Sequence, residues 1–265
     1  MIGNTDPHVK PRLAEYINSS ERHIKEQLLP FRGLFHEKAL VMVHDKRIGR
    51  YTTPRGSEAQ FQPGSRGRVL ANLLGIQRRR DLDRAEYEAL VKAKEAYLGR
   101  VAAETRFTCD LICRMHRDWL GGIYEWAGQY RGVDVEKGGF RWPPAVRVGQ
   151  NMVRFEAELL ARSTPCRPGE IAEVARKIAK VHADFLLIHP FREGNGRIAR
   201  WIAELMALQA GLVIPDFGFM GRGSRRRRQE YLEAVVDGYE TNYEPLAAIF
   251  VAAVERRLRG LDRPT

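Results

Sequence analysis

The chain has 265 residues, a formal net charge of +11 and a pI of about 9.8. Hydrophobic residues make up 44% and charged residues 29% of it, which excludes the disordered and fibrous classes and indicates a globular protein. No stretch approaches the roughly 18 apolar residues of a membrane span and the N-terminus does not resemble a signal peptide, so we expect a cytoplasmic protein without a membrane partner.

The N-terminal part, residues 1–68, predicts an arm or small cap whose role the sequence leaves open. It holds an amphipathic stretch around 13–29 and a short apolar run at 39–43, followed by a polar segment with Gly and Pro. From Val69 onward helical periodicity with few breaks takes over. We therefore assign 69–265 to one main domain.

The main domain carries apolar residues at steps of three or four along most of its length. Such spacing places the apolar side chains on one side of a helix and requires a buried contact. Glycines and prolines mark the helix ends. The pattern predicts helices over 83–105, 108–120, from Pro143-Pro144 to 160, over 169–188 at the centre of the fold, and over 197–210, 225–237 and 243–259.

One segment has the alternation of a β-strand instead. Apolar residues alternate across 130–135, and a glycine-bearing turn leads to an apolar return through 140–142. This pattern predicts a β-hairpin, and hence an all-α chain with one small hairpin. Its turn is formed by Lys137, Gly138 and Gly139, and Phe140 begins the return strand.

A loop rich in reactive side chains interrupts two strongly apolar helices. It reads His189-Pro190-Phe191-Arg192-Glu193-Gly194-Asn195-Gly196-Arg197, with Arg200 one turn later. A turn directly before a helix presents free backbone N–H groups, and the helix dipole adds about half a positive charge. We therefore expect Gly194, Asn195 and Gly196 to form an anion site, with the Asn195 side chain as a further donor. Arg197 and Arg200 add the charge that a polyphosphate requires.

Two residues of the loop suggest chemistry beyond phosphate binding. Glu193 would repel a phosphate unless a cation intervened, and Mg²⁺ commonly takes one carboxylate together with substrate phosphate oxygens. His189 has an ordinary pKa near 6.5, so it can accept a proton from a hydroxyl group at neutral pH. The loop therefore predicts a magnesium ligand and a general base beside a polyphosphate.

At these residues the sequence resembles the Fic family, whose motif is His-x-Phe-x-Asp/Glu-Gly-Asn-Gly-Arg-x-x-Arg. Every position matches from His189 to Arg200, and the similarity extends over roughly 69–250. The resemblance implies that 69–265 is a Fic catalytic domain with an all-α core and a β-hairpin flap beside the active loop. It also implies transfer of AMP from ATP to a Ser, Thr or Tyr hydroxyl of a target protein, with release of pyrophosphate.

The resemblance assigns a role to each matching residue. His189 corresponds to the base that deprotonates the target hydroxyl, and Glu193 to the ligand of a Mg²⁺ ion that bridges the nucleotide phosphates. The remaining matches are Gly194, Asn195 and Gly196 at the α- and β-phosphates, Arg197 at the β-phosphate, Arg200 at the γ-phosphate, and Lys137, Gly138, Gly139 and Phe140 in the flap that clamps an extended target segment.

One departure from the family concerns inhibition. Many relatives carry a helix with Ser/Thr-x-x-x-Glu, whose glutamate pairs with the second arginine of the motif. No Ser or Thr of this chain has a Glu four residues later. We therefore expect either an unrestrained enzyme or restraint by a separate antitoxin-like protein that supplies the motif, as in the toxin members of the family.

Several alternatives stay open. The phosphate site reads only phosphates, so UTP, GTP or a CDP-alcohol could be the donor. Kinase activity like that of Doc fits less well, because those relatives depart from Gly-Asn-Gly-Arg, and removal of AMP is usually linked to the missing glutamate. From another class, the net charge and the two runs Arg78–Arg80 and Arg225–Arg228 suggest a nucleic-acid-binding protein, although solvated arginines explain the runs better. Tyr231 could line a nucleobase pocket, but we expect it to pack in the core.

Overall fold

The computed structural model describes residues 58, 60–137 and 139–261. Most of the predicted arm and Gly138 of the predicted hairpin therefore lie outside the described residues. The part of 1–68 that is described forms turns, and Phe61 pairs with Leu70 in an isolated antiparallel bridge. The division of the chain at residue 68 stays a prediction.

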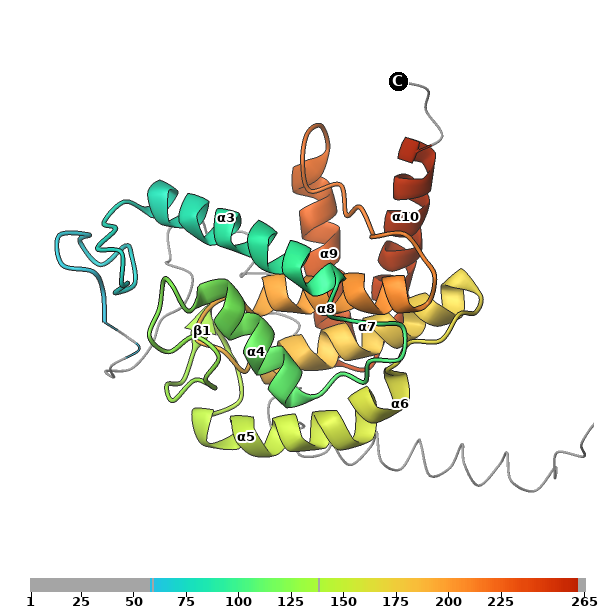
Figure 1. Ribbon diagram of the computed structural model, residues 1–265, viewed down its shortest axis with the longest axis horizontal. Coiled ribbons are helices and arrows are strands. Elements are labelled where there is room, and N and C mark those ends of the chain that lie inside the picture. The colour runs from blue at the N-terminus through green and yellow to red at the C-terminus, as the bar shows by residue number, and fades with distance from the viewer. Residues whose placement is uncertain (1–57, 59, 138, 262–265) are drawn as a thin grey trace, which may run out of the picture.

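The regular elements of the described chain are helices, apart from one two-stranded hairpin, which confirms the predicted all-α fold. Two helices precede the hairpin, a nearly continuous helical segment follows it, and four helices complete the chain (Figure 1). In order these are α3 (Arg79–Leu98), α4 (Cys109–Leu120), β1 (Glu136–Lys137), β2 (Phe140–Arg141), α5 (Ala145–Arg154), the π-helical turn Phe155–Leu160, α6 (Ala161–Ser163), α7 (Ile171–Ile188), α8 (Asn195–Gln209), α9 (Ser224–Tyr239) and α10 (Glu244–Leu261).

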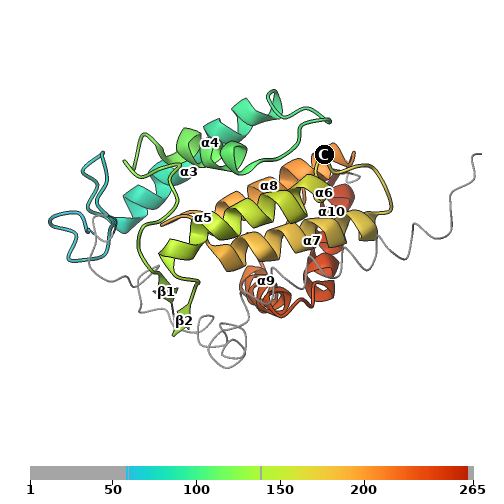
Figure 2. The same cartoon turned by 90° about the horizontal axis from the view of Figure 1, so that it is seen from below.

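Helix α7 is the centre of the molecule, as its apolar pattern predicts. It packs against α8, α9 and α10, while α3 and α4 cover α8 from the other side (Figure 2). All residues from Val181 to Ile188 are buried, so α7 contacts neighbours around its whole circumference in its last two turns. The active loop follows this rigid segment directly.

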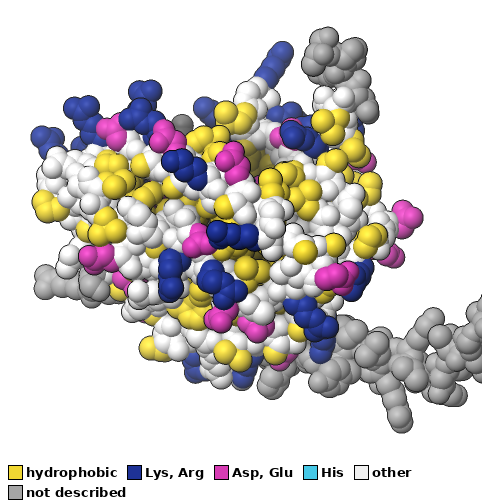
Figure 3. All heavy atoms as spheres, viewed as in Figure 1, with side chains coloured by type: hydrophobic (Ala, Val, Ile, Leu, Met, Phe, Trp, Pro, Cys, Tyr) yellow, Lys and Arg dark blue, Asp and Glu magenta, His cyan; other side chains and the backbone are white. Residues whose placement is uncertain are grey.

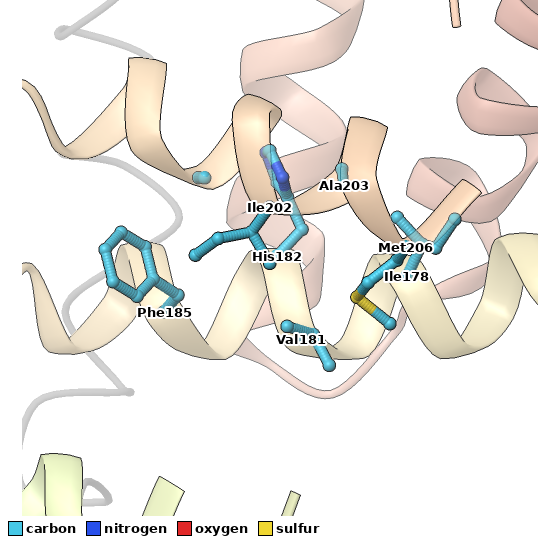
Figure 4. A pocket seen from close by; sticks show the side chains of 8 residues that line it. Ile178, Val181, His182, Phe185, Ile202, Ala203 and Met206 are labelled. Atoms are coloured by element: carbon cyan, nitrogen blue, oxygen red, sulfur yellow. The ribbon is translucent and has the colours of Figure 1, made fainter. Parts of the chain in front are cut away.

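The contact between α7 and α8 is apolar and contains one histidine. Figure 4 shows this seam, where side chains of the two helices surround His182. Dense packing of this kind fixes the position of both helices and of the loop between them. The lining residues are Ile178, Val181, His182 and Phe185 of α7 and Ala199, Ile202, Ala203 and Met206 of α8.

Helix boundaries differ from the predicted ones by a few residues, with the largest difference at α3. The helix predicted over 83–105 begins at Arg79 and ends at Leu98, because Gly99 forms its C-cap. At α4 the side chain of Thr108 accepts a hydrogen bond from the N–H of Leu111, as an N-cap residue does.

The predicted hairpin exists but is short. Its strands are antiparallel, with Glu136 opposite Arg141 and Lys137 opposite Phe140. Pairing continues only to Val135, whose carbonyl accepts from the N–H of Trp142, and residues 130–134 form no strand. The N–H of Arg131 instead donates to the carbonyl of Pro190 in the active loop. The hairpin is thereby tied to the loop that follows α7.

Basic side chains are distributed over the surface among acidic ones. Figure 3 shows Lys and Arg scattered over one face, without a single continuous basic patch on that face. In the run Arg225–Arg228 three of the four arginines are exposed, which agrees with a solvated helix start. Among the described residues, no helix is long and apolar enough to span a membrane.

Candidate active site

The site begins where α7 ends. His189 caps this helix with φ 54°, a left-handed conformation that is uncommon for a residue other than glycine. Arg131, itself 2% exposed, donates from its guanidinium to the carbonyls of His189, Val133 and Pro143. One buried arginine thus satisfies backbone acceptors of both the helix end and the segments around the hairpin.

The imidazole of His189 is buried and held in one tautomer. Its Nδ1 lies 3.1 Å from the carbonyl oxygen of Leu186, and its ring packs against Trp142 with 4.1 Å between centroids. Because a carbonyl only accepts, Nδ1 carries the proton and Nε2 is the nitrogen that can accept another. Burial lowers the pKa of His189 to about 3, so the ring is uncharged at neutral pH.

Asn195 closes the loop from inside. Its Oδ1 accepts from the N–H of Phe191 at 2.9 Å, and its Nδ2 donates to the carbonyl of Phe191 at 2.7 Å. The side chain is fully buried. Its Oδ1 and one N–H of its Nδ2 are thus used within the turn, and donation from this amide to a phosphate oxygen stays a prediction. The backbone N–H of Asn195 lies in the first turn of α8, where N–H groups have no partner within the helix.

His116 of α4 supports the loop from the opposite side. Its Nδ1 accepts from the N–H of Gly128 at 2.8 Å, so its Nε2 donates to the carbonyl of Glu193 at 3.0 Å. The ring stacks on Phe191 with 3.9 Å between centroids. Burial lowers the pKa of His116 to about 4, which keeps this ring neutral as well.

Gly194 is required by packing as well as by conformation. It precedes α8 with φ +88°, and a Cβ atom there would lie 2.8 Å from the ring of Trp119. At Gly196 the same atom would meet only Arg200 at 3.5 Å, an ordinary contact. The two glycines therefore have different reasons for lacking a side chain.

An open cleft of about 420 Å³ lies at the N-terminus of α8. Its wall combines four cationic side chains with a single carboxylate and two glycines, as a polyphosphate site requires. His189 and Asn195 are buried and do not line this wall. The lining residues are Arg79, Lys137, Glu193, Gly194, Gly196, Arg197 and Arg200.

Arg197 is held on several sides. Its Nη1 lies 2.7 Å from Oε2 of Glu86 on α3, and its Nη2 lies 3.4 Å from Oε1 of Glu193. The guanidinium also lies over the ring of Trp119, with 4.5 Å from Cζ to the ring centroid. A long side chain that would otherwise sample many rotamers is thus confined to one place on the cleft wall.

Arg200 lies against two aromatic rings that contact each other, Phe219 and Tyr231, whose centroids are 5.3 Å apart. Its Cζ is 5.8 Å from the centroid of Phe219 and 5.9 Å from that of Tyr231. The hydroxyl of Tyr231 lies 2.7 Å from Nε2 of His182 and 3.5 Å from the Arg200 guanidinium. Tyr231 is 4% exposed, so the expectation that it packs in the core is confirmed.

The residues present suit a magnesium ion only together with a ligand. Glu193 puts one carboxylate on the cleft wall, and its Oε1 accepts from the N–H of Gly194 at 3.0 Å. Within the described residues no group of three or more His, Cys, Asp or Glu could hold a metal ion. A hard cation here would depend on phosphate oxygens, which is the usual mode for Mg²⁺.

The sequence did not predict the residues that support the loop, which are Glu86, His116 and Arg131. Glu86 lies on the buried stripe of α3 between Leu82 and Leu90, and a carboxylate at such a position was the one available signal. His116 lies on the buried face of α4 in the same way. Arg131 gave no signal, because a single arginine in an irregular segment looks like any surface residue.

The family model and the most similar curated proteins agree on one family. The model of the Fic/DOC family matches residues 106–207. The chain is 30% identical over 181 residues to protein adenylyltransferase VbhT of Bartonella schoenbuchensis, covering 68% of this chain and 36% of that protein. It is 31% identical over 136 residues to the probable protein adenylyltransferase y4lH of Sinorhizobium fredii, covering 51% of this chain and 66% of that protein. The chain thus spans only part of the length of both relatives.

Solved structures share the fold. The N-terminal Fic domain of an effector protein from Bartonella sp. AR 15-3 superposes with a TM-score of 0.62 at 19% identity, covering 78% of this chain and 96% of that one. The BepC protein of Bartonella tribocorum, solved with bound AMPPNP, gives 0.60 at 22% identity, covering 75% and 98%. These likenesses establish the helical architecture.

Proposed function

Because the chain belongs to the Fic/DOC family, we propose that it is a protein adenylyltransferase, which transfers AMP from ATP to a Ser, Thr or Tyr hydroxyl of a target protein. The observation that carries the proposal is the cleft at the head of α8, where Arg197, Arg200, Lys137 and Arg79 face one carboxylate. Four cations around one such cleft suit a triphosphate. The AMPPNP held by BepC supports a nucleotide of this type.

The residues divide into binding and proton transfer. The backbone N–H groups of Asn195 and Gly196 bind the α- and β-phosphates. Gly194 lies beside them on the cleft wall, where the missing side chain lets a phosphate approach, while its own N–H donates to Glu193. Arg197 binds the β-phosphate and Arg200 the γ-phosphate. His189 accepts the proton of the attacking hydroxyl at Nε2. A new bond forms between that hydroxyl oxygen and the α-phosphorus, and the bond from the α-phosphorus to the bridging oxygen of pyrophosphate breaks.

Glu193 would hold Mg²⁺ through its carboxylate on the cleft wall. Such an ion, when bound, neutralises charge on the phosphates and on the departing pyrophosphate. The carboxylate is already fixed by the N–H of Gly194, so its place does not depend on the ligand.

The hairpin supplies the surface for the target protein. Lys137 lies on the cleft wall, and Gly139 has φ +77° directly before β2. Phe140 is 2% exposed and packs on Trp142, so its side chain anchors the hairpin and its backbone is the part that can pair with a target strand.

Regulation and location follow from the same reasoning. A separate antitoxin-like protein would supply the Ser/Thr-x-x-x-Glu motif that the sequence lacks. The enzyme would act in the cytoplasm, and 69–265 would be its catalytic domain.

The test is incubation with ATP labelled at the α-phosphate, Mg²⁺ and a lysate of candidate targets. Label should appear on a protein and disappear with His189→Ala. Parallel incubations with UTP, GTP and CTP labelled in the same way show whether another nucleotide is the donor. A chain that binds DNA in a salt-sensitive way, with no label from any nucleotide and no effect of His189→Ala, would instead support the nucleic-acid-binding alternative.

A further inference from the structure

Glu86 is a buried carboxylate outside both the active loop and the segment that the family model matches. It lies on α3, and its side chain is 1% exposed. Removing a carboxylate from water costs several kcal/mol unless it is paired and hydrogen-bonded, so a charge at this position requires partners. These partners come from α8, from α4 and from the segment that follows α4.

Both carboxylate oxygens of Glu86 are engaged. Oε2 lies 2.7 Å from Nη1 of Arg197, and Oε1 accepts from the hydroxyl of Tyr124 at 2.6 Å. The backbone carbonyl of Glu86 accepts from the indole N–H of Trp119 at 2.8 Å, and the same indole lies beneath the Arg197 guanidinium. Carboxylate, indole and guanidinium therefore form one connected unit.

A second ion pair between the same two helices lies away from the cleft. Lys94 of α3 and Glu204 of α8 approach to 2.6 Å, two turns further along both helices. This pair already links α3 to α8. The Glu86 pair differs in that its cation lies on the wall of the cleft, with a side chain that is 20% exposed.

We propose that Glu86 is a positioning residue for the nucleotide, which holds the Arg197 guanidinium from the buried side so that its other N–H groups meet the β-phosphate. This inference rests on the proposed function. The opposite reading is that Glu86 competes with the phosphate for Arg197 and inhibits the enzyme. Competition would separate Arg197 from a carboxylate that is buried and fixed by Tyr124, and a buried charge left without its partner is strongly unfavourable. The pair therefore persists when the phosphate binds.

The experiment compares Glu86→Gln with the matched control Glu204→Gln in the full chain. Calorimetry gives the dissociation constants for ATP, ADP and AMP, and steady-state AMP transfer gives kcat and KM. We expect Glu86→Gln to weaken ATP and ADP about tenfold or more, with AMP changed less than about twofold, because AMP lacks the β-phosphate. Loss of transfer should appear mainly in KM for ATP. Glu204→Gln should leave the ADP to AMP ratio at the wild-type value.

Tyr124→Phe keeps the charge of Glu86 and removes one of its anchors, so it should shift the ADP to AMP ratio in the same direction by less. Tyr124→Phe also tests the inference if Glu86→Gln fails to fold. An unchanged ratio in these variants overturns the inference, as does tighter ADP binding, which would mark Glu86 as a competitor. An equal shift in Glu204→Gln would assign the effect to helix packing and overturn it as well.

The binding ratio separates this inference from the proposed function. If the wild-type chain prefers ADP to AMP but labels no protein, the transferase proposal fails while Glu86 is still tested. If the wild-type chain labels a target and Glu86→Gln leaves the ratio unchanged, only the inference fails.

Discussion

Asn195 binds Phe191 through both ends of its side-chain amide, with 2.9 Å from the Phe191 nitrogen to Oδ1 and 2.7 Å from Nδ2 to the Phe191 oxygen. The turn between α7 and α8 is thus held in shape by a side chain that does not reach the cleft. The shape of the proposed phosphate site is therefore a property of the loop itself.

Asn195→Ala should unfold the protein more easily. It leaves a buried N–H and a buried carbonyl of Phe191 without these partners, and each unsatisfied group costs about 1–3 kcal/mol. We expect the free energy of unfolding in urea to fall by about 2–4 kcal/mol. Asn242→Ala, at an exposed position of the α9–α10 turn, is the control and should change it by less than about 0.5 kcal/mol. A loss equal to that of the control would show that the amide contributes little.

The two glycines of the loop should respond in opposite ways to alanine. Gly194→Ala meets Trp119 at 2.8 Å and an unfavourable φ of +88°, so it should destabilise the fold. Gly196→Ala meets only Arg200, at an ordinary 3.5 Å, and lies in the first turn of α8. Alanine is favoured over glycine by about 0.5–1 kcal/mol in the middle of a helix, so a gain of at most this size is expected here. The melting temperature of Gly196→Ala should rise while its affinity for ATP falls, because the methyl group occupies the approach of a phosphate. Unchanged ATP affinity in Gly196→Ala would argue against a phosphate at this backbone.

How far the sequence predicts this site depends on the kind of contact. The loop from His189 to Arg200 could be recognised because its residues are adjacent in the chain and match one motif. Helices and the hairpin follow from periodicity, which reports the buried face of an element. Periodicity does not report the partner across that face, so the pairing of Glu86 with Arg197 needed the fold. For the same reason Asn195 was expected to face the ligand, although its turn uses it internally.

The protein should lose stability on acidification at pH values well above the pKa range of ordinary carboxylates. His116, His182 and His189 are buried, and burial lowers their pKa values to about 4, 3 and 3, below an ordinary value of 6.5. Below pH 6.5 these histidines therefore bind protons in the unfolded chain but stay unprotonated in the folded chain. Stability is fully present above pH 6.5 and falls as the pH drops toward 4, by up to about 1.4 kcal/mol per pH unit for each histidine.

The measurement is the free energy of unfolding between pH 7 and pH 5. His182→Phe is the informative variant, since His182 lies in the apolar seam between α7 and α8 and outside the cleft. It removes one of the three histidines, so the slope below pH 6.5 should fall by about one third. A slope identical to that of wild type would mean that His182 is protonated in the folded protein, contrary to its burial.

Arg200 should discriminate ATP from ADP. Its guanidinium lies against Phe219 and Tyr231 on the cleft wall, one helical turn beyond Arg197. If it meets the γ-phosphate, Arg200→Ala should weaken ATP about tenfold or more and leave ADP within about twofold, since a charge-assisted hydrogen bond contributes about 1.5–3 kcal/mol. Arg228 provides a matched control, because its guanidinium lies 5.5 Å from the same Phe219 ring but is exposed and donates to the Phe219 carbonyl. Arg228→Ala should leave both affinities at the wild-type level, and an equal loss of ATP and ADP in Arg200→Ala would move this arginine from the γ- to the β-phosphate.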